Sequence, residues 1–349
     1  WIMAYTDIDK PSDYFVTNLH TGNGGTQDIT GVGFAPNWIW IKNITSAEGS
    51  GVFDTVRGVT KMLCSQNSDG ESTTANSLTA FGSDGFSVGA NNRVNQNTNN
   101  IVSWNWKAET SFTNDASGTG IGSIDSAGSA NTDAGFSIVS YTGTGSDGTI
   151  KHGLSQKPSM IITKDRGNAE HWACYHKSLP AGYNIYLNLN NAQDDNDTIY
   201  TTTAPTSSVY SIGTNNRTNG SSRNYIAYCF AEKQGYSKFG SYIGNGNADG
   251  TFIYTGFKPA FLIIKRTSAV DTWHLVDNKR DPHNMVEQNT SPDTNAADNA
   301  NAVDFDFLSN GFKLRNTDNN GNNSGDTYIY MAFAEEPFVT STGVPATAR

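Results

Sequence analysis

The most informative pattern along the chain is a long apolar run that occurs three times. It follows a glycine, an apolar residue and a proline in the stretches GFAPNWIWIK (33–42), GLSQKPSMIITK (153–164) and GFKPAFLIIK (256–265), and each run ends in lysine. A run of this length, rich in β-branched and aromatic residues, predicts a strand that is covered on both faces. The proline lies at the start of the strand, where a missing N–H costs little.

Each copy also closes on a strand in which every second residue is apolar, as expected when one face of a strand is buried. The alternating apolar residues are Val102, Trp104 and Trp106 in the first copy, Ile226, Tyr228 and Phe230 in the second, and Ile329, Met331 and Phe333 in the third. The copies span 33–106, 153–230 and 256–333, which are similar lengths. Self-similarity at a regular spacing predicts a repeat architecture.

Short strand-like segments and glycine-rich turns such as HTGNGG (20–25) fill each copy, and helical periodicity is nearly absent. Six to eight short strands in roughly a hundred residues are typical of a β-sandwich. A propeller is the alternative, but its blades take about 40 to 50 residues, and three blades are fewer than usual. We therefore predict an all-β chain of three serial, homologous, jelly-roll-like β-sandwich repeats joined by short or Gly/Ser-rich linkers.

The expected segments follow from the spacing of the copies. They are an N-terminal arm (1–14), repeat 1 (15–109), a Gly/Ser/Asp-rich linker (110–134), repeat 2 (135–232), a short linker (233–238), repeat 3 (239–336) and a C-terminal tail (337–349). Tyr236 and Phe239 are expected to pack between repeats 2 and 3. Trp40, Ile162 and Ile263 are expected to occupy the same position in the three repeats.

The positions that stay apolar in all copies predict the core. The residues expected to be buried are Trp38, Trp104, Trp106, Met160, Tyr228, Phe230, Phe261, Met331 and Phe333. Their size differs between copies while their apolar character is kept. This combination indicates residues that pack in a core, not residues of an active site.

Charge and cysteine content narrow the range of functions. A formal net charge of −10 argues against a nucleic-acid partner, which requires clustered Lys and Arg. No apolar run approaches the roughly 18 residues of a membrane helix, and no signal peptide opens the chain. Cys64, Cys174 and Cys229 show no CxxC spacing, so neither a disulfide framework nor a zinc site is indicated. We expect a soluble protein made in a reducing compartment, without membrane insertion.

Few residues are candidates for chemistry. His171 and His176 are close in sequence, but positions five apart on a strand point to opposite faces. The polar tracts 191–198 and 316–326 contain side chains with the oxygen atoms that calcium prefers, such as Asp318, Asn320 and Asp326. Neither tract has the order of acidic residues, glycine and terminal glutamate that defines an EF-hand. HEXXH, GXSXG and P-loop motifs are absent. We assign no catalytic, cofactor-binding or metal-binding residue and no cofactor, although a hydrolase with dispersed Asp and Glu remains open.

Several stretches carry a resemblance to a known family. They include GFSIVSYTG, KPSMIITKDR, WACYHKSL, YIAYCFAEKQGYSKFGSYIGNGNADG, FIYTGFKPAFLIIKRT and DFLSNGFKLR. The chain resembles, over nearly its whole length, a repeated β domain of unknown function found in bacteriophages, especially marine ones, in tail-fibre-like and other virion structural proteins. The resemblance implies a virion protein assembled in the host cytoplasm, with other virion proteins as partners and a homotrimer as its assembly.

The predicted function is a non-enzymatic virion structural protein, a tail fibre or appendage subunit that binds a host-surface glycan or protein. One alternative is a capsid decoration or head fibre protein. A second is a virion-associated glycan hydrolase, which needs a carboxylate pair about 5 to 10 Å apart in a cleft. Carboxylates scattered over loop rims would favour binding, and a buried pair in a groove would favour hydrolysis.

Overall fold

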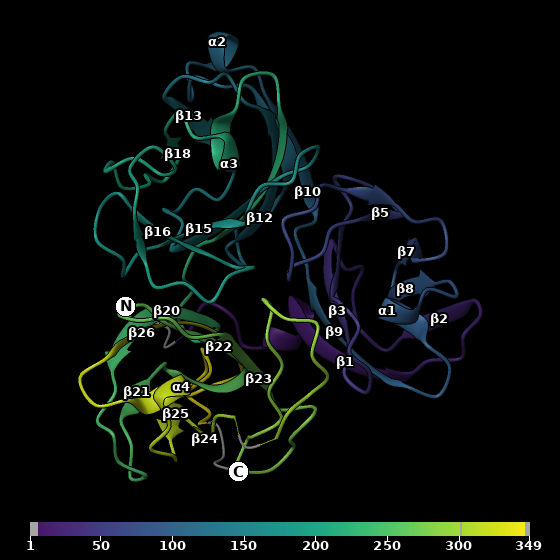
Figure 1. The fold of residues 1–349 in the computed structure, drawn as a ribbon, viewed down its shortest axis with the longest axis vertical. Coiled ribbons are helices and arrows are strands. Elements are labelled where there is room, and N and C mark those ends of the chain that lie inside the picture. Colours follow the sequence, from purple (N-terminus) through teal and green to yellow (C-terminus); the bar gives the residue numbers. More distant parts are fainter. Residues whose placement is uncertain (1–5, 301, 346–349) are drawn as a thin grey trace.

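The computed structural model describes residues 6–300 and 302–345 and confirms an all-β fold (Figure 1). Most strands fall into three groups along the chain, which we call unit 1 (15–106), unit 2 (136–230) and unit 3 (237–337). The helices of the described part are single turns. In the same residues, no helix is long and apolar enough to span a membrane.

The bounds of the elements are as follows. Unit 1 contains β1 (Phe15–Thr21), β2 (Gln27–Thr30), β3 (Trp38–Asn43), β4 (Gly51–Asp54), β5 (Lys61–Met62), β6 (Ser72–Thr73), β7 (Leu78–Gly82), β8 (Gly85–Val88), α1 (Asn92–Asn95) and β9 (Asn100–Trp106). Unit 2 contains β12 (Phe136–Thr142), β13 (Gly148–Lys151), β14 (Met160–Asp165), β15 (Ala173–His176), β16 (Tyr183–Tyr186), β17 (Asp194–Asp195), β18 (Val209–Ile212), α3 (Asn216–Asn219) and β19 (Asn224–Phe230). Unit 3 contains β20 (Ser237–Ile243), β21 (Phe252–Tyr254), β22 (Phe257–Arg266), β23 (Trp273–Asp277), β24 (Phe305–Leu308), β25 (Gly311–Leu314), α4 (Asn319–Asn322) and β26 (Thr327–Pro337). Outside the units lie the 3-10 helix η1 (Pro11–Asp13), β10 (Thr110–Asn114), α2 (Ala116–Thr119) and β11 (Ser126–Asn131).

Each unit is built on an antiparallel sheet with the same order of strands. The orders are β1-β9-β3-β4, β12-β19-β14-β15 and β20-β26-β22-β23. A smaller sheet packs on one face of each: β2-β8-β7, β13-β18 and β21-β25-β24. The strands β3, β14 and β22 are buried almost throughout, since both of their faces are covered. This double covering explains the continuous apolar run in each copy.

A buried asparagine ends the helical turn of each unit and holds the glycine-rich turn between the first two strands. These residues are Asn95, Asn219 and Asn322. Their side-chain oxygens accept backbone N–H bonds from Asn23, Thr144 and Asn245 at 2.9, 2.8 and 2.9 Å. Their amide nitrogens donate to carbonyls of Gly25, Ser146 and Asn247 at 2.7, 2.6 and 2.8 Å. These three asparagines therefore have a structural role in the turn of each unit.

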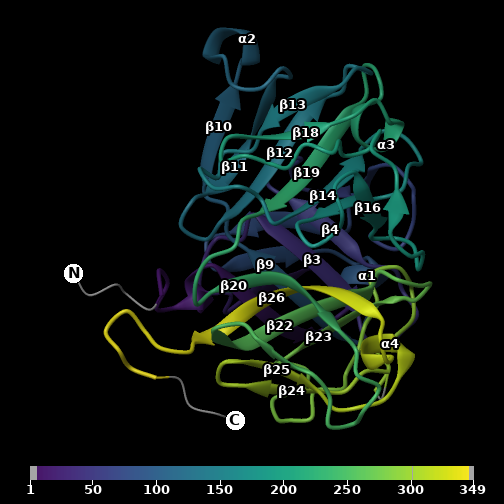
Figure 2. The ribbon, with the colours of Figure 1, turned by 90° about the vertical axis from the view of Figure 1, so that its left-hand side faces the viewer.

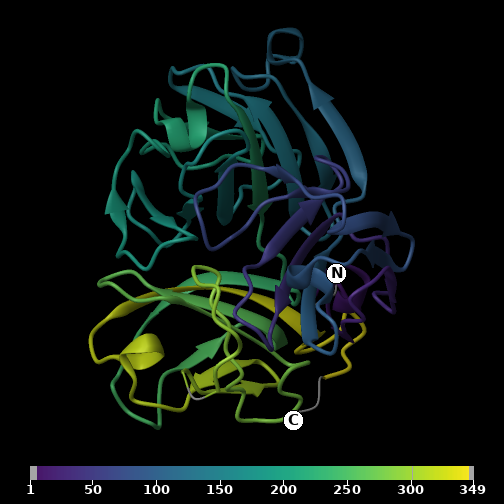
Figure 3. The same cartoon turned by 45° about the vertical axis from the view of Figure 1, so that its right-hand side comes forward.

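The three large sheets turn their second faces toward one another and share one aromatic core. All nine residues expected to be buried are buried, and all nine belong to this single cluster. Phe230 of unit 2, for example, lies 5.7 Å from Trp38 of unit 1 and 6.1 Å from Phe333 of unit 3, measured between ring centroids. Figures 1 and 3 show the three units grouped around this centre.

The arrangement of the units differs from the sequence-based prediction. Trp40, Ile162 and Ile263 do occupy the same register, opposite the middle apolar residue of the closing strand. Their side chains, however, point into the shared core and not into the interior of separate sandwiches. The prediction of serial sandwiches is not confirmed, because each large sheet is sandwiched between its own small sheet and the other units.

The segment predicted to be a linker, 110–134, is not a linker in the structure. β10 and β11 pair with each other, and β11 pairs with β12, so both strands extend the large sheet of unit 2 (Figure 2). Small residues such as Gly128 and Ala130 suit a strand that gains its stability from backbone pairing with a neighbouring edge. The composition resembles that of a flexible segment, and only the pairing distinguishes the two.

The connection between units 2 and 3 agrees with the prediction for Phe239, which lies 6.1 Å from Phe230 of unit 2, whereas Tyr236 contacts Tyr14 of the arm and Phe333 of unit 3. Tyr236 and Phe239 are buried in the shared core, and both contact Phe333 at 5.5 and 6.3 Å between ring centroids. Of the predicted arm (1–14) and tail (337–349), the structure describes residues 6–14 and 337–345. Ile8 of the arm also lies in the shared core.

Candidate functional site

The histidines considered as a metal pair have separate protein partners. His171 Nδ1 lies 2.9 Å from Asn188 Nδ2, whereas His176 is fully buried with Nε2 3.1 Å from the Tyr330 carbonyl. Within residues 6–300 and 302–345, no group of three or more His, Cys, Asp or Glu side chains is arranged to hold a metal ion. The two histidines belong to the packing of units 2 and 3.

The three residues of the tract 316–326 that were considered as oxygen ligands also have protein partners, although only Asp326 engages its side-chain oxygens. Asp326 pairs with Arg266 and accepts a bond from Ser268 Oγ at 2.7 Å. Asn320 donates its side-chain amide to the Ala302 carbonyl at 3.1 Å. Asp318 precedes α4 and accepts backbone bonds through its carbonyl. These contacts are those of a folded loop.

The cysteines are unreactive by environment. Cys64, Cys174 and Cys229 are buried and unpaired. Burial raises the pKa of each thiol, most strongly for Cys174 and Cys229. Because the thiolate is the reactive form, none of these side chains is suited to nucleophilic chemistry.

Two buried histidines are held as neutral rings. Nδ1 of His152 accepts the Leu154 N–H, and Nδ1 of His176 accepts the Ser178 N–H, both at 3.2 Å. The proton is therefore on Nε2, which faces the carbonyls of Thr206 and Tyr330 at 3.2 and 3.1 Å. Burial lowers the pKa of both rings to about 4.

Stability is expected to fall as the pH is lowered from 6.5 to about 4. In this window the unfolded chain binds protons that the folded His152 and His176 do not bind, so the free energy of unfolding rises with pH. The loss is about 2–3 kcal/mol for each ring. Urea unfolding at pH 7 and pH 4.5 measures it. The variant H176Q controls for the carboxylates and should lose less stability over this range; an equal loss would contradict the assignment.

Two buried ion pairs and a buried histidine lie at the junctions between units. Asp54 pairs with Arg57 at 2.5 Å and accepts the hydroxyl of Tyr228 from unit 2 at 2.8 Å. In unit 3, Asp277 pairs with Arg280 at 2.7 Å and accepts the indole N–H of Trp104 from unit 1 at 3.1 Å. The equivalent position in unit 2 is His176, which contacts Tyr330 of unit 3. The contacts run from unit 1 to 2, 2 to 3 and 3 to 1, which makes a closed ring.

The lysine that ends each long apolar run is buried at the other side of these junctions. Burial lowers the pKa of Lys42, Lys164 and Lys265 to about 8. Lys164 Nζ donates to the Ser68 carbonyl of unit 1 at 3.1 Å, and Lys265 Nζ donates to the Asn190 carbonyl of unit 2 at 3.3 Å. Lys164 and Lys265 therefore hold loops of the preceding unit, whereas Lys42 donates to the Glu48 carbonyl of its own unit, and all three have a structural role.

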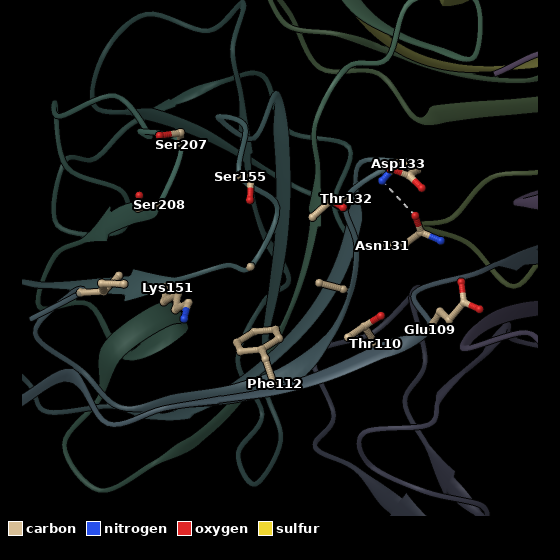
Figure 4. Close-up of a pocket in the computed structure, with 13 residues that line it drawn as sticks. Glu109, Thr110, Phe112, Asn131, Thr132, Asp133, Lys151, Ser155, Ser207 and Ser208 are labelled. Atoms are coloured by element: carbon tan, nitrogen blue, oxygen red, sulfur yellow. Dashed lines mark hydrogen bonds between the residues drawn. The ribbon is translucent and has the colours of Figure 1, made fainter. Parts of the chain in front are cut away.

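A pocket of about 610 Å³ lies beside the two strands that only unit 2 carries (Figure 4). Phe112 of β10 projects into it, half-buried against the outer core of unit 2. Lys151 Nζ lies 6.0 Å from the centre of its ring. Residue 153 is a glycine with φ +78°, and a Cβ there would lie 3.0 Å from Phe112 Cε1, so a larger residue would press on the ring.

Polar groups surround this ring. Glu109 and Asp133 lie on one side of the pocket and Lys151 on the other, with Ser155, Ser207 and Ser208 completing the polar lining; Figure 4 shows this arrangement. Glu109 and Asp133 are exposed. An aromatic floor with hydroxyl, carboxylate and ammonium groups at the rim can bind a small polar molecule with an apolar face. We call this the Phe112 pocket.

Sequence reasoning did not identify the Phe112 pocket, although a signal was present. The first two copies of the long apolar run are separated by more residues than the second and third, and the surplus is 110–135. Since the other units fold without this surplus, the scaffold does not require it. A segment that the scaffold does not require is a candidate for function.

Comparison with known proteins gives a family but no activity. No curated protein matches the sequence. One family model, described as a domain of unknown function (DUF7483), matches residues 10–337. This match runs from η1 to the end of β26, so one family domain includes all three units and the inserted strands. The chain therefore belongs to the DUF7483 family.

Proposed function

We propose that this protein is a non-enzymatic structural subunit of a phage particle, a tail fibre or related appendage, that binds the host surface through the Phe112 pocket. The pocket is the observation that carries the binding role, because two strands absent from units 1 and 3 build its floor. The virion role rests on the sequence resemblance. The ligand is a glycan or a protein segment that offers hydroxyl or amide groups and an apolar face.

Two alternative functions can be tested by experiment. A capsid decoration or head fibre protein would show the same pocket and would differ in its place on the particle. A glycan hydrolase would use Glu109 and Asp133, which line the pocket. Their exposure favours binding, since a general acid is normally kept protonated by burial.

The proposal includes a homotrimer, and its support is the resemblance alone. Apolar sheet faces that separate sandwiches would expose are covered within one chain by the shared core. Burial of these faces therefore needs no partner. Light scattering of the purified chain gives the assembly state, and a stable monomer would remove this part of the proposal.

Binding is expected to depend on the flat ring of Phe112. The variant F112L keeps an apolar side chain against the core of unit 2 but loses the flat face, and we expect cell binding about tenfold weaker. Fluorescently labelled protein on a panel of marine bacterial isolates, read by flow cytometry, measures this. The matched control is F81L, since Phe81 is also half-buried but lies in unit 1, away from the pocket.

The same isolates test the hydrolase. Release of reducing sugar from their envelopes, abolished by E109Q or D133N, would replace the binding proposal with hydrolysis. Equal binding by F112L and wild type would remove the pocket from the proposal.

A further inference from the structure

The outer strand of each small sheet has a common design. β2, β13 and β21 each place one isoleucine inward, Ile29, Ile150 and Ile253. Each isoleucine pairs in register with an aromatic residue of the next strand, Phe86, Tyr210 or Phe312. The residues on either side of the isoleucine point outward, because side chains alternate along a strand. The three strands can therefore be compared position by position.

The outward positions differ between the units in one respect. In unit 1 they are Asp28 and Thr30, and in unit 2 they are Thr149 and Lys151. In unit 3 they are aromatic: Phe252 is 43% exposed and Tyr254 is 58% exposed. Two units fold with polar residues here, so the scaffold does not explain the aromatic pair.

The aromatic pair is also not explained by a need to cover a glycine of the neighbouring strand. A Cβ at Gly311 would lie 3.1 Å from Phe252 Cε2, so this ring rests against the glycine of the neighbouring strand. Unit 1 has a glycine, Gly85, at the same register position opposite Thr30 and has no ring there. The rings of unit 3 thus lie on an exposed sheet surface for a reason other than folding.

The charges beside the rings neutralise one another. Lys313, which is opposite Phe252 in register, pairs with Asp249, and Arg315 pairs with Asp306 at 3.3 Å. Tyr254 also borders a cavity of about 520 Å³ whose lining includes the ion pair of Lys238 and Glu232 at 2.7 Å and the side chain of Asp7. The charges directly beside the two rings are paired, which favours a neutral ligand there.

The size of the surface argues against a protein partner. A fully buried Phe or Tyr side chain covers about 150–250 Å². The exposed parts of the two rings therefore present about 200 Å², far less than the roughly 800 Å² that each partner contributes to a stable protein interface. The surface fits a ligand about the size of one or two sugar rings.

We propose that Phe252 and Tyr254 form a stacking surface for a neutral saccharide. Pyranose rings have an apolar face of C–H groups and an edge of hydroxyls, which match the aromatic faces and the ion-paired side chains around them. The inference rests on the proposed surface-binding function and adds a second site on unit 3. β21 lies in the lower part of the molecule in Figure 1, while the strands of the Phe112 pocket lie in the upper part.

The test is affinity electrophoresis in native gels that contain a neutral polysaccharide: dextran, laminarin, xylan or galactan. We expect at least one polymer to retard the wild-type chain. The double variant F252T/Y254T, which uses the threonines found at equivalent positions of the other units, should bind that polymer about tenfold or more weakly. The matched control is D28A/T30A at the same positions of unit 1, which should keep wild-type retardation. Thermal unfolding confirms that the variants fold.

The outcomes separate the two proposals. Retardation that persists in F252T/Y254T and is lost in F112L would overturn the saccharide surface and leave the Phe112 pocket standing. Retardation by none of the four polymers would also overturn it, whatever the cell-binding assay shows. A loss of mass by light scattering in F252T/Y254T would identify the surface as an interface between copies of the chain, again in place of the saccharide.

Discussion

Replacing Arg57 by alanine is expected to lower the free energy of unfolding by about 3–5 kcal/mol. The side chains of Arg57 and Asp54 are fully buried and their ion pair measures 2.5 Å. The guanidinium also donates to the carbonyls of Val52 and Lys61, both at 2.9 Å. Its removal leaves the Asp54 carboxylate buried without its cation, together with unpaired carbonyl groups, and this uncompensated charge accounts for most of the cost.

The contact of Asp54 with unit 2 should also contribute to the free energy of unfolding. Asp54 also accepts the hydroxyl of Tyr228, and Arg57 donates to that hydroxyl at 3.3 Å, so Y228F removes two bonds between units while leaving the ion pair intact. We expect Y228F to cost about 1–2 kcal/mol, less than R57A. Equilibrium unfolding in urea measures both variants.

An exposed ion pair provides the control. Lys10 and Asp13 are 71% and 50% exposed, and K10A should change the free energy of unfolding by no more than about 1 kcal/mol. If R57A behaved like K10A, the buried ion pair would contribute little, and the closed ring of junctions would depend on apolar packing alone.

Truncating Phe230 to alanine is expected to destabilise all three units together, at a cost of about 3–5 kcal/mol. Phe230 belongs to unit 2, but its ring lies near Trp38 and Trp106 of unit 1 and Phe333 of unit 3, at 5.7, 6.4 and 6.1 Å between centroids. A cavity at this place removes contacts from every unit. Because the three units share this core, the cavity should lower the stability of each unit.

Hydrogen exchange followed by mass spectrometry distinguishes a shared core from separate cores. Peptides from 15–106, 136–230 and 237–337 should lose protection by similar amounts in F230A, and urea should unfold the variant in one transition. Loss of protection confined to 136–230 would show that unit 2 unfolds by itself and would contradict the shared core. F86A is the control for an outer core, since Phe86 lies in the separate apolar cluster of unit 1.

Each of the two candidate sites occurs in only one of the three units. The Phe112 pocket depends on strands added to unit 2, and the saccharide surface depends on two substitutions in unit 3. In both cases the other units serve as internal references for what the fold requires. Comparison among units within one chain thus separates residues needed for folding from candidates for function, which the apolar pattern alone does not do.

The sequence by itself determined the class of fold and the location of the core residues. Alternation along a strand and the length of an apolar run are local properties, so Trp38, Phe230 and Phe333 could be identified as buried without any knowledge of their neighbours. The same reasoning correctly placed Phe239 between units 2 and 3, where it contacts Phe230 and Phe333. It did not reveal the buried asparagines, because asparagine is equally common in exposed turns.

Only the tertiary structure decided which surfaces face one another. An apolar run shows that a strand is covered on both faces, but it does not show whether the cover is the unit's own small sheet or another unit, because both supply the same apolar environment. The closing of the ring through Asp54 and Tyr228 joins residues 174 positions apart in the chain. β10 and β11 are strands because the edge of β12 is free to pair with them, and that long-range backbone pairing leaves no mark in a segment of small and polar residues.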